Sequence, residues 1–525
     1  MHHTVQKPEL NINKNCAFDS VNEEENVLME VRNLSISFTQ YMKGLRHSTM
    51  QVIDNVNLTI GKGEVVAVIG ASGSGKSLLA SAILGILPKN ANLTGSIYYE
   101  GKALNAEETA RLRGKSMALI PQSINSLDPL MKTGRQVQTV DKERKRAKIN
   151  KILSKLRLPP ETEIKYPFQL SGGMARRVLT ATAMASEAQL VIADEPTPGL
   201  DEESLKETIG HIRQFADDGR GVMLITHDID AALKIADRIA VFNAGTVVEV
   251  AQTNGFSGKG EKLKHPYTRA LWNALPQNSF IPIENIQSMA NSRSDKLAPI
   301  SVQVTGPGEK ETDKNKMHRG VGSSYKLEAN DVGFRYGKGP WIFRNVDINV
   351  RPGEVVGLFG PSGLGKTTLA RIIAGYEKPT DGSIKIDNKP IPLRGYHPVQ
   401  LVWQNPEKAV NPRWRLEKTL REGWWPDDHI LADLKIDKSW LKRWPNELSG
   451  GELQRFCLAR ALGPDTRYLI ADEMTTMLDA VTQAQIWDVI LKTSEERQIG
   501  VLAISHDLPL LKRISNRMID FSELG

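Results

Sequence analysis

The feature that most constrains this 525-residue chain is a glycine-rich segment that occurs twice. Residues 70–77 read GASGSGKS, residues 360–367 read GPSGLGKT, and both fit the pattern G-x-x-x-x-G-K-[ST]. In this pattern, backbone N–H groups wrap the phosphates of a nucleotide. Each segment follows a short apolar run with the composition of a buried strand, at residues 65–69 and 355–359. Two matches in the same context predict that a whole nucleotide-binding module is duplicated.

Further landmarks follow both phosphate loops in the same order, as a tandem repeat requires. In the first and second copies they are Gln122 and Gln404, LSGG at 170–173 and 448–451, Asp194-Glu195 and Asp472-Glu473, Leu200-Asp201 and Leu478-Asp479, and His227 and His506. From the LSGG serine to the glutamate is 24 residues in both copies. From the glutamate to the histidine is 32 residues in the first copy and 33 in the second. The copies therefore share one plan.

The repeat divides the chain into four parts. We expect a polar N-terminal tail at 1–27, a first domain at 28–275, a linker at 276–325 and a second domain at 326–525. The linker is rich in Asn, Ser, Lys, Gly and Pro and has little apolar periodicity. In each domain, strands and helices alternate in the order expected of a mostly parallel sheet, with a helical insertion before LSGG. The predicted fold class is α/β.

Composition narrows the class of protein. The chain is 40% hydrophobic and 25% charged, which is ordinary for a soluble globular protein. No run approaches 18 uninterrupted apolar residues, so no membrane-spanning helix is expected. The polar N-terminus lacks the basic-then-apolar order of a signal peptide. Two cysteines, Cys16 and Cys457, predict a reducing compartment and exclude a cysteine-ligated metal site within one chain.

The net charge gives little information about partners. It is +7, from 68 basic and 61 acidic residues, which does not argue for nucleic acid or lipid. No nucleic-acid partner is expected. The densest basic run, at 142–148, precedes apolar residues at helical spacing, and we interpret it as the solvated face of an amphipathic helix.

The repeated motifs carry the groups that phosphoryl transfer needs. Lys76 and Lys366 would reach the β- and γ-phosphate oxygens, and Ser77 and Thr367 would place a hydroxyl on Mg²⁺. The aspartate of each Asp-Glu pair would hold Mg²⁺, directly or through water. A buried strand that ends in two unpaired acids is costly, so a purely structural role is disfavoured.

Two further groups in each copy suit hydrolysis. Glu195 and Glu473 would polarise the attacking water, as general base or by orienting it. His227 and His506 each follow a second apolar strand, where an imidazole can donate to a γ-phosphate oxygen. Recurrence at matched spacing favours this role over a structural one.

The LSGG segment between a phosphate loop and an Asp-Glu strand resembles the signature of ATP-binding cassette (ABC) ATPases. The resemblance covers about residues 28–275 and 326–525. It implies two P-loop ABC ATPase domains, each a mostly parallel sheet core with a helical subdomain. It also implies ATP and Mg²⁺ as cofactors and a head-to-tail sandwich, in which ATP lies between the phosphate loop of one half and the signature of the other.

The resemblance implies a role for each matching residue. The catalytic residues would be Glu195, Glu473, His227 and His506. The nucleotide would be bound by Gly70, Ser72, Gly73, Gly75, Lys76, Ser77, Gln122, Ser171, Gly172, Gly173, Tyr336, Gly360, Ser362, Gly363, Gly365, Lys366, Thr367, Thr368, Gln404, Ser449, Gly450 and Gly451. Mg²⁺ would be held by Ser77, Gln122, Asp194, Thr367, Gln404 and Asp472.

These roles combine into two composite sites. Site one would pair Lys76 with the signature at 449–451, and site two would pair Lys366 with the signature at 171–173. Tyr336 would stack on the adenine in the second half. Phe38 is its counterpart in the first half, where core packing is an equal alternative.

The end of the first half indicates a branch of the family. HPYTRAL at 265–271 and IPQSINSLDP at 120–129 are similar to elements of the ATPases that energise oligopeptide, dipeptide and nickel importers. That branch implies two permease subunits, an extracytoplasmic solute-binding protein, and a peripheral location on the cytoplasmic face of the inner membrane. The solute would be a peptide, nickel or a metal chelate, with 475–479 and 483–487 favouring a metal slightly. The alternatives are a soluble twin-cassette factor acting on ribosomes and a sugar-importer ATPase.

The chain departs from the family pattern at several positions. Arg176 stands where the signature commonly continues with glutamine, and Met474 stands where the first half has Pro196. No cysteines follow HPYT before the second half begins, and the second half lacks its own HPYT element. We expect two hydrolytic sites that need not be equal. Six tryptophans lie between residue 403, in the loop of the second glutamine, and the second signature, and Trp424 or Trp425 is the expected permease contact.

Overall fold

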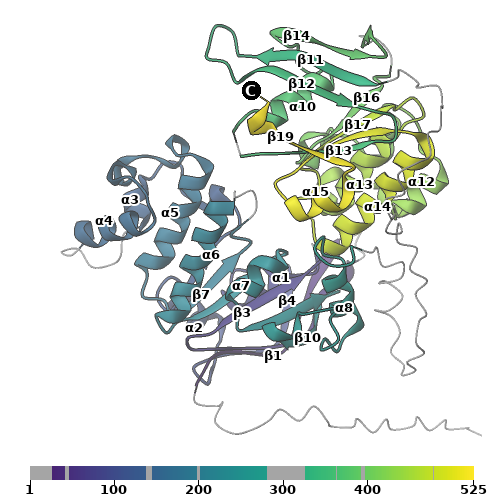
Figure 1. The fold of residues 1–525 in the computed structure, drawn as a ribbon. Helices are drawn as coiled ribbons and strands as arrows, with labels where there is room; N and C mark the ends of the chain where they lie inside the picture. The colour runs from purple at the N-terminus through teal and green to yellow at the C-terminus, as the bar shows by residue number, and fades with distance from the viewer. Residues whose placement is uncertain are drawn as a thin grey trace, which may run out of the picture.

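The computed structural model describes residues 26–41, 47–71, 73–137, 145–197, 202–280, 326–361, 363–391, 396–476 and 478–524. The predicted N-terminal tail up to residue 25 and the predicted linker from residue 281 onward lie outside them. Figure 1 shows two halves, the first coloured purple to teal and the second green to yellow, with corresponding elements in the same order. The fold is α/β, as predicted from the sequence.

A mostly parallel sheet forms the centre of each half. Its strand order is β10-β9-β3-β8-β7-β6 in the first half and β16-β17-β18-β13-β19 in the second. Among the described strands of these two sheets, only the β9–β10 pair is antiparallel. The strands are β3 (Val65–Gly70), β6 (Met117–Ile120), β7 (Leu190–Asp194), β8 (Gly221–Ile225), β9 (Arg238–Asn243), β10 (Thr246–Gln252), β13 (Val355–Phe359), β16 (Val399–Val402), β17 (Tyr468–Asp472), β18 (Gly500–Ile504) and β19 (Arg517–Asp520). The carboxyl ends of parallel strands meet at one edge, where such sheets bind ligands.

The sequence does not predict the second, antiparallel sheet of each half. Its strand order is β2-β1-β4-β5 in the first half and β12-β11-β14-β15 in the second. The strands are β1 (Val27–Tyr41), β2 (His47–Gly61), β4 (Ala91–Tyr99), β5 (Lys102–Ala103), β11 (Leu327–Phe334), β12 (Phe343–Val350), β14 (Asp381–Ile386) and β15 (Lys389–Pro390). Its inner face shares a buried apolar cluster with β3 or β13 and the following helix, so it positions the phosphate loop from below.

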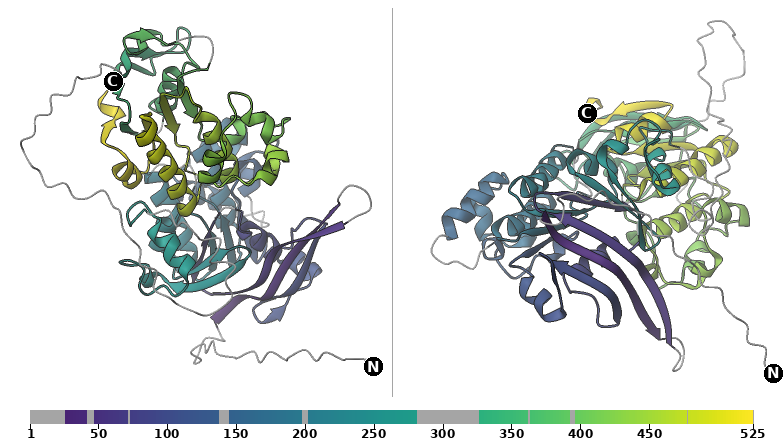
Figure 2. Two further views of the ribbon diagram at one scale, coloured as in Figure 1. Left: turned by 90° about the vertical axis from the view of Figure 1, so that its right-hand side faces the viewer. Right: turned by 90° about the horizontal axis from the view of Figure 1, so that it is seen from below.

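Helices cover the sheets and form the predicted insertion before each signature. They are α1 (Lys76–Ile83), α2 (Ala106–Leu112), α3 (Thr133–Val137), α4 (Lys145–Lys155), α5 (Gly172–Ala185), α6 (Glu202–Asp217), α7 (Ile229–Ile235), α8 (Pro266–Asn273), α10 (Lys366–Ile373), α11 (Leu416–Leu420), α12 (Asp428–Asp433), α13 (Gly450–Ala461), α14 (Ala480–Arg497) and α15 (Leu508–Ile514). Figure 1 and the right-hand view of Figure 2 show α3 and α4, coloured blue, projecting away from the second half.

The described part of the basic run, residues 145–148, lies at the start of α4, which is an amphipathic helix, as the apolar spacing predicts. Ile149, Ile152, Leu153 and Leu156 are buried along one face of α4 and just after it. Lys148 and Lys151 are exposed on the other face. Residues 142–144 of the run lie outside the described part of the chain.

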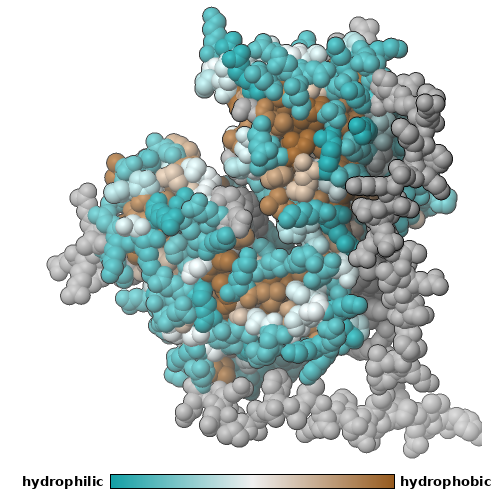
Figure 3. All heavy atoms as spheres, viewed as in Figure 1, coloured by the Kyte–Doolittle hydropathy of each residue, from teal (hydrophilic) through white to brown (hydrophobic). Residues whose placement is uncertain are grey.

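The two halves meet where the end of the first half contacts the second. Helix α8 packs against α14, and Arg513 of α15 donates a hydrogen bond to the carbonyl of Ser279 at 2.8 Å. On the face drawn in Figure 3, most residues are hydrophilic, and hydrophobic residues gather over β12 and β13 in the second half and over β3 and β4 in the first. No helix in the described ranges is long and apolar enough to cross a membrane.

Candidate functional site

The first phosphate loop joins the fully buried strand β3 to helix α1. Gly70, Gly73 and Gly75 have φ angles of 151°, 76° and 105°, which L side chains rarely adopt. At Gly70 a Cβ would lie only 2.0 Å from the carbonyl oxygen of Phe242, so the turn also needs glycine for space. Lys76 is 6% exposed, and its Nζ donates to the carbonyls of Gly70 and, at 2.8 Å, Ala71. Burial lowers the pKa of Lys76, while nearby carboxylates oppose the shift.

The second phosphate loop repeats this geometry between β13 and α10. Lys366 Nζ donates to the carbonyls of Gly360 and Pro361, both at 2.8 Å. Gly365 has a φ of 102°, and a Cβ there would lie 2.6 Å from the side chain of Ile342. Thr368 lies in the first turn of α10 and is partly buried. Ser72 and Ser362, the predicted serines of the two loops, lie outside the described residues.

A hydroxyl and a carboxylate meet beside each loop. Ser77 Oγ donates to Asp194 Oδ1 at 3.0 Å, and Thr367 Oγ1 donates to Asp472 Oδ1 at 3.3 Å. Burial raises the pKa of Asp194, and it raises the pKa of Asp472 to about 6. A paired hydroxyl and carboxylate supply the oxygen ligands that Mg²⁺ prefers, so these residues fit the ion predicted there. Among the residues that the structure describes, no group of three His, Cys, Asp or Glu side chains forms a denser metal cluster.

The glutamates and histidines lie next to these carboxylates. His227 Nδ1 is 2.8 Å from Glu195 Oε2, and His506 Nε2 is 2.8 Å from Glu473 Oε1. Burial opposes protonation of His227, but the Glu195 carboxylate outweighs it, so the pKa of His227 is raised. Glu195 and Glu473 have φ angles of 46° and 47°, a region that costs a non-glycine residue energy and is typical of functional sites.

The two predicted glutamines are placed differently. Gln404 Nε2 donates to Glu473 Oε2 at 2.9 Å, so the second half joins Gln404, Glu473 and His506 in one network. Gln122 is exposed. The two halves therefore differ at this position although both glutamines were predicted to bind Mg²⁺ and nucleotide.

Each signature serine caps the helix that follows it. Ser171 Oγ accepts a hydrogen bond from the N–H of Met174, and Ser449 Oγ accepts one from the N–H of Glu452. The Glu452 carboxylate in turn accepts from Ser449 N at 2.7 Å, which completes a capping box in the second signature alone. Both helix N-termini can bind an anion with their free N–H groups.

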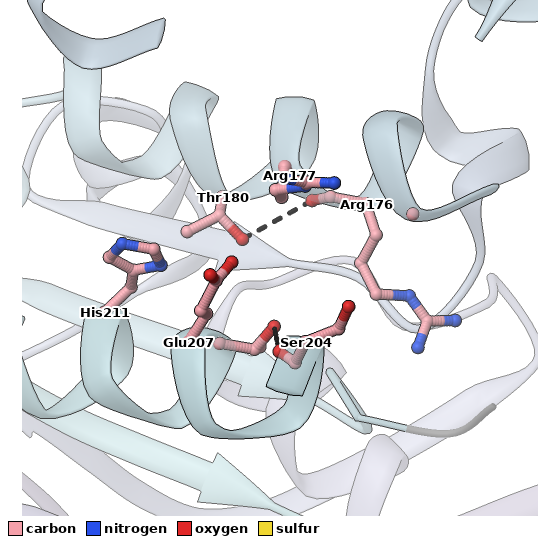
Figure 4. A pocket seen from close by; sticks show the side chains of 8 residues that line it. Arg176, Arg177, Thr180, Ser204, Glu207 and His211 are labelled. Atoms are coloured by element: carbon pink, nitrogen blue, oxygen red, sulfur yellow. Dashed lines mark hydrogen bonds between the residues drawn. The ribbon is translucent and has the colours of Figure 1, made fainter. Parts of the chain in front are cut away.

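Arg176, the departure in the first signature, contacts the Asp-Glu strand end. Its Nη1 donates to the carbonyl of Pro196 at 3.3 Å, and burial lowers its pKa. Figure 4 shows Arg176 on α5 above a cavity of about 10 Å³, which α6 closes from below with Glu207 and His211. The corresponding Gln454 of the second signature instead donates to the carbonyl of Trp403 at 3.1 Å. With arginine in place of glutamine, the first signature helix is therefore bonded to the segment after the Asp-Glu strand, whereas the second is bonded to the loop of the predicted glutamine.

The structure brings together the residues of site one across the two halves. A Cβ at Gly73 in the first phosphate loop would lie 3.8 Å from the Cβ of Ser449 in the second signature. His227 Nε2 also lies 3.3 Å from the carbonyl oxygen of Thr476 in the second half. These contacts set the first phosphate loop opposite the second signature.

Among the described residues, the structure shows no contact between the phosphate loop and the signature predicted to form site two. A Cβ at Gly172, Gly173 or Gly363 would meet no atom within 4 Å. The Ser171 hydroxyl bonds within its own helix, and the Lys366 ammonium bonds within its own loop. Because the halves meet through α8 and α14, one side is in contact while the other stands open. The pairing of site two remains a prediction.

The candidate adenine contacts also differ. Tyr336 is 58% exposed, and its ring packs edge-on against buried Phe334 with a centroid distance of 5.0 Å, so one face is free for a base. Phe38 is partly buried and packs against the core of the first half. Of the two tryptophans predicted to contact a permease, Trp425 is 42% exposed, whereas the indole N–H of Trp424 donates to the carbonyl of Arg460.

Sequence reasoning missed two residues at site one. Tyr267 of the HPYT element and Asp479 of the second Leu-Asp pair are both buried beside the first phosphate loop. Both motifs stand out in the sequence, but nothing in their spacing indicates that they meet each other. The counterpart Leu200-Asp201 lies outside the described residues.

Known proteins are similar to this chain along most of its length. The sequence profile of the family described as ABC transporter matches residues 53–198 and 343–476. "Uncharacterized ABC transporter ATP-binding protein YejF" of Escherichia coli strain K12 is 30% identical, over 94% of this chain and 93% of that protein. "Peptidoglycan transport ATP-binding protein YejF" of Agrobacterium fabrum is 31% identical, over 94% of this chain and 90% of that protein. "Glutathione import ATP-binding protein GsiA" of Pectobacterium atrosepticum is 29% identical, over 94% of this chain and 84% of that protein.

Solved structures share the fold over most of the chain. A structure titled "RNase-L Inhibitor" covers 95% of this chain and 88% of its own, with a TM-score of 0.60 and 21% identity. The archaeal ribosome recycling factor aABCE1, solved in complex with ribosomal stalk protein aP1, covers the same shares with a TM-score of 0.58 and 20% identity. At this identity the likeness shows the twin-cassette fold alone.

Proposed function

Since this chain belongs to the ABC transporter family and is an ATPase whose ATP hydrolysis is coupled to transport, we propose that it energises an importer of peptides or peptide-like solutes. The observation that carries the proposal is the close approach of the first phosphate loop to the second signature within one chain, where a Cβ at Gly73 would lie 3.8 Å from the Cβ of Ser449. Among the relatives that match 94% of this chain, one is named for glutathione import and another for peptidoglycan transport, which supports transport of a peptide-containing solute. Glutathione is a short peptide, so these names favour the peptide class over the predicted nickel or metal chelates.

The phosphate loops would hold ATP by their backbones. The N–H groups that precede α1 and α10 face the phosphates, and the buried ammonium groups of Lys76 and Lys366 exchange loop carbonyls for phosphate oxygens. The signature of the opposite half then supplies a hydroxyl and helix N–H groups to the γ-phosphate. Closure of site two requires the first signature to approach the second phosphate loop.

Ser77 with Asp194, and Thr367 with Asp472, would hold Mg²⁺. An ion held there would supply positive charge that stabilises the negative charge developing on the transferred phosphoryl group. The carboxylate must be ionised for this role, and the buried aspartates are held so by the cation when it is present. In the second half, the hydrogen bond from Gln404 to Glu473 links Gln404 to the residues beside this ion site.

Glu195 and Glu473 would orient and deprotonate the attacking water. Each carboxylate is fixed by a histidine at 2.8 Å, which limits its rotation. In the first site, His227 also lies 3.3 Å from the carbonyl oxygen of Thr476, so its position depends on the second half. Hydrolysis at site one is therefore tied to the contact between the halves.

The proposal requires two permease subunits and a solute-binding protein as partners, and a peripheral location at the inner membrane. The helical insertions are the surfaces proposed to meet the permeases, and Trp425 is an exposed aromatic candidate on the second one. Trp424 is half-buried and its indole N–H already donates to the carbonyl of Arg460, which makes it the weaker candidate for a contact.

A pull-down from membranes tests the function. The tagged full chain should co-purify with two hydrophobic permeases, and its ATPase activity in vesicles should rise when the binding protein carries its solute. Glutathione and short peptides should stimulate more than nickel or a nickel chelate. Co-sedimentation with ribosomes and no membrane partner would contradict the proposal, and preferential stimulation by nickel would correct the solute class. The Lys76→Ala/Lys366→Ala chain, which should bind ATP poorly, controls for stimulation unrelated to the two sites.

A further inference from the structure

The segment after β10 is held firmly at the junction of the halves. The carboxylate of Glu249 accepts hydrogen bonds from the N–H groups of Lys264 and His265 at 2.8 and 3.0 Å, which fixes the start of α8. At the other end, Trp272 Nε1 donates to the carbonyl of Gly258, and Ser279 is bound by the second half. Helix α8 is thus anchored to the first half and packs against α14 of the second.

Tyr267 points from this helix into the junction. It is 4% exposed, and its hydroxyl oxygen is buried with no hydrogen-bond partner among the residues that the structure describes. The Ala71 N–H of the first phosphate loop and the Asp479 carboxylate of the second half are its polar neighbours. Burial, with a contribution from Asp479, raises the pKa of Tyr267, so the group stays a protonated donor. A buried donor without a partner is costly, which indicates that the partner is acquired in another state of the protein.

Asp479 is the charged acceptor at the start of α14, the helix against which α8 packs, and its charge acts on Tyr267. It is 3% exposed and caps α14, where Thr482 N and Oγ1 donate to its two oxygens at 3.1 and 2.9 Å. The negative charge of Asp479 acts to raise the pKa of Lys76 in the first phosphate loop and of Arg455 in the second signature helix. Asp479 therefore lies between the two components of site one, and Tyr267 faces it from α8.

We propose that Tyr267 is a positioning residue for site one, whose hydroxyl donates to Asp479 when the halves close on ATP and so fixes the second signature over the first phosphate loop. The inference rests on the proposed function, because it presumes that ATP binds at site one. The HPYT element then regulates one of the two sites, and the inequality of the sites arises from the junction as well as from the signatures.

The test measures ATP affinity at each site separately. Glu195→Gln and Glu473→Gln block hydrolysis, and adding Lys366→Ala leaves site one as the high-affinity site, whereas adding Lys76→Ala leaves site two. Tyr267→Phe removes only the hydroxyl. Loss of a hydrogen bond to a charged group predicts an affinity about tenfold lower at site one. At site two the change should stay within about twofold, as expected of a distant independent position.

Matched controls separate positioning from folding. Tyr468→Phe removes another buried hydroxyl without a partner and should change neither affinity. The melting temperature of Tyr267→Phe should not fall, because the lost group is unpaired. In the Asp479→Asn background, Tyr267→Phe should have less effect than alone, since the two act through one contact.

The outcomes distinguish this inference from the proposed function. Equal weakening at both sites, or an unchanged affinity at site one, overturns the role of Tyr267 and leaves the ATPase proposal standing. Independent, multiplicative effects of Tyr267→Phe and Asp479→Asn also overturn it. Absence of ATP binding in the parent chain refutes both proposals.

Discussion

Replacing the two glutamates by glutamine should separate ATP binding from hydrolysis. Glu473 Oε1 lies 2.8 Å from His506 Nε2, and Gln404 Nε2 donates to Oε2 at 2.9 Å, so the carboxylate is oriented from both sides. Glu195 is 8% exposed and lies 2.8 Å from His227. Glutamine has the same shape but cannot accept the proton of the attacking water, so the change removes the base and preserves the packing.

The size of the effect follows from this role. General-base catalysis contributes about 10²–10⁴ in rate, which corresponds to about 3–5 kcal/mol of barrier. The Glu195→Gln/Glu473→Gln chain should therefore release phosphate at roughly 1% of the parent rate or less. Its affinity for ATP should stay within about threefold, because no phosphate contact is lost. If the two sites hydrolyse ATP independently, Glu195→Gln alone or Glu473→Gln alone should leave up to half of the parent turnover. If hydrolysis at one site depends on the other, either single variant should retain far less.

Phosphate release and equilibrium ATP titration on the same preparations give both quantities. Glu203→Gln, at a side chain that is 82% exposed, is the matched control and should leave both unchanged. A double variant that keeps more than about a tenth of the parent rate would refute the assignment of Glu195 and Glu473 as bases.

Two further predictions concern stability and pH. Gly70→Ala places a Cβ 2.0 Å from the Phe242 oxygen and should lower the free energy of unfolding by about 1–3 kcal/mol. Gly210→Ala in α6, where a Cβ meets nothing within 4 Å, should raise the free energy of unfolding by up to about 1 kcal/mol. Equal effects of the two changes in chemical denaturation would contradict the geometry. Burial, with a contribution from Asp228 of the other half, raises the pKa of Asp507. A carboxyl raised in this way stabilises the fold fully below its ordinary pKa and loses that contribution as pH rises through the raised value. Asp507→Asn keeps the helix cap and should therefore melt above the parent at pH 7.5, with the difference shrinking toward pH 4; a gap that does not vary with pH would show that the charge is not responsible.

Much of the site could be predicted because its chemistry lies in contiguous motifs. The loops at 70–77 and 360–367, and the strands that end in Asp194 and Asp472, each place their groups through local geometry. The antiparallel sheets were not predicted, because strands such as β2 are long and only partly alternating and pair with partners far along the chain. The meeting of Tyr267 with Asp479 depends on how two halves dock, and no local pattern encodes that.

The central claim is that each phosphate loop is completed by the signature of the opposite half. A Cβ at Gly73 would lie 3.8 Å from that of Ser449, close to the separation found in disulfides. In a chain with Cys16 and Cys457 replaced, the Gly73→Cys/Ser449→Cys pair should form a disulfide that keeps the halves joined after cleavage at a protease site engineered near residue 300. The Gly363→Cys/Ser171→Cys pair should do so only with ATP bound in the hydrolysis-blocked chain. Failure of the first pair to cross-link under oxidising conditions, with or without ATP, would contradict the composite site.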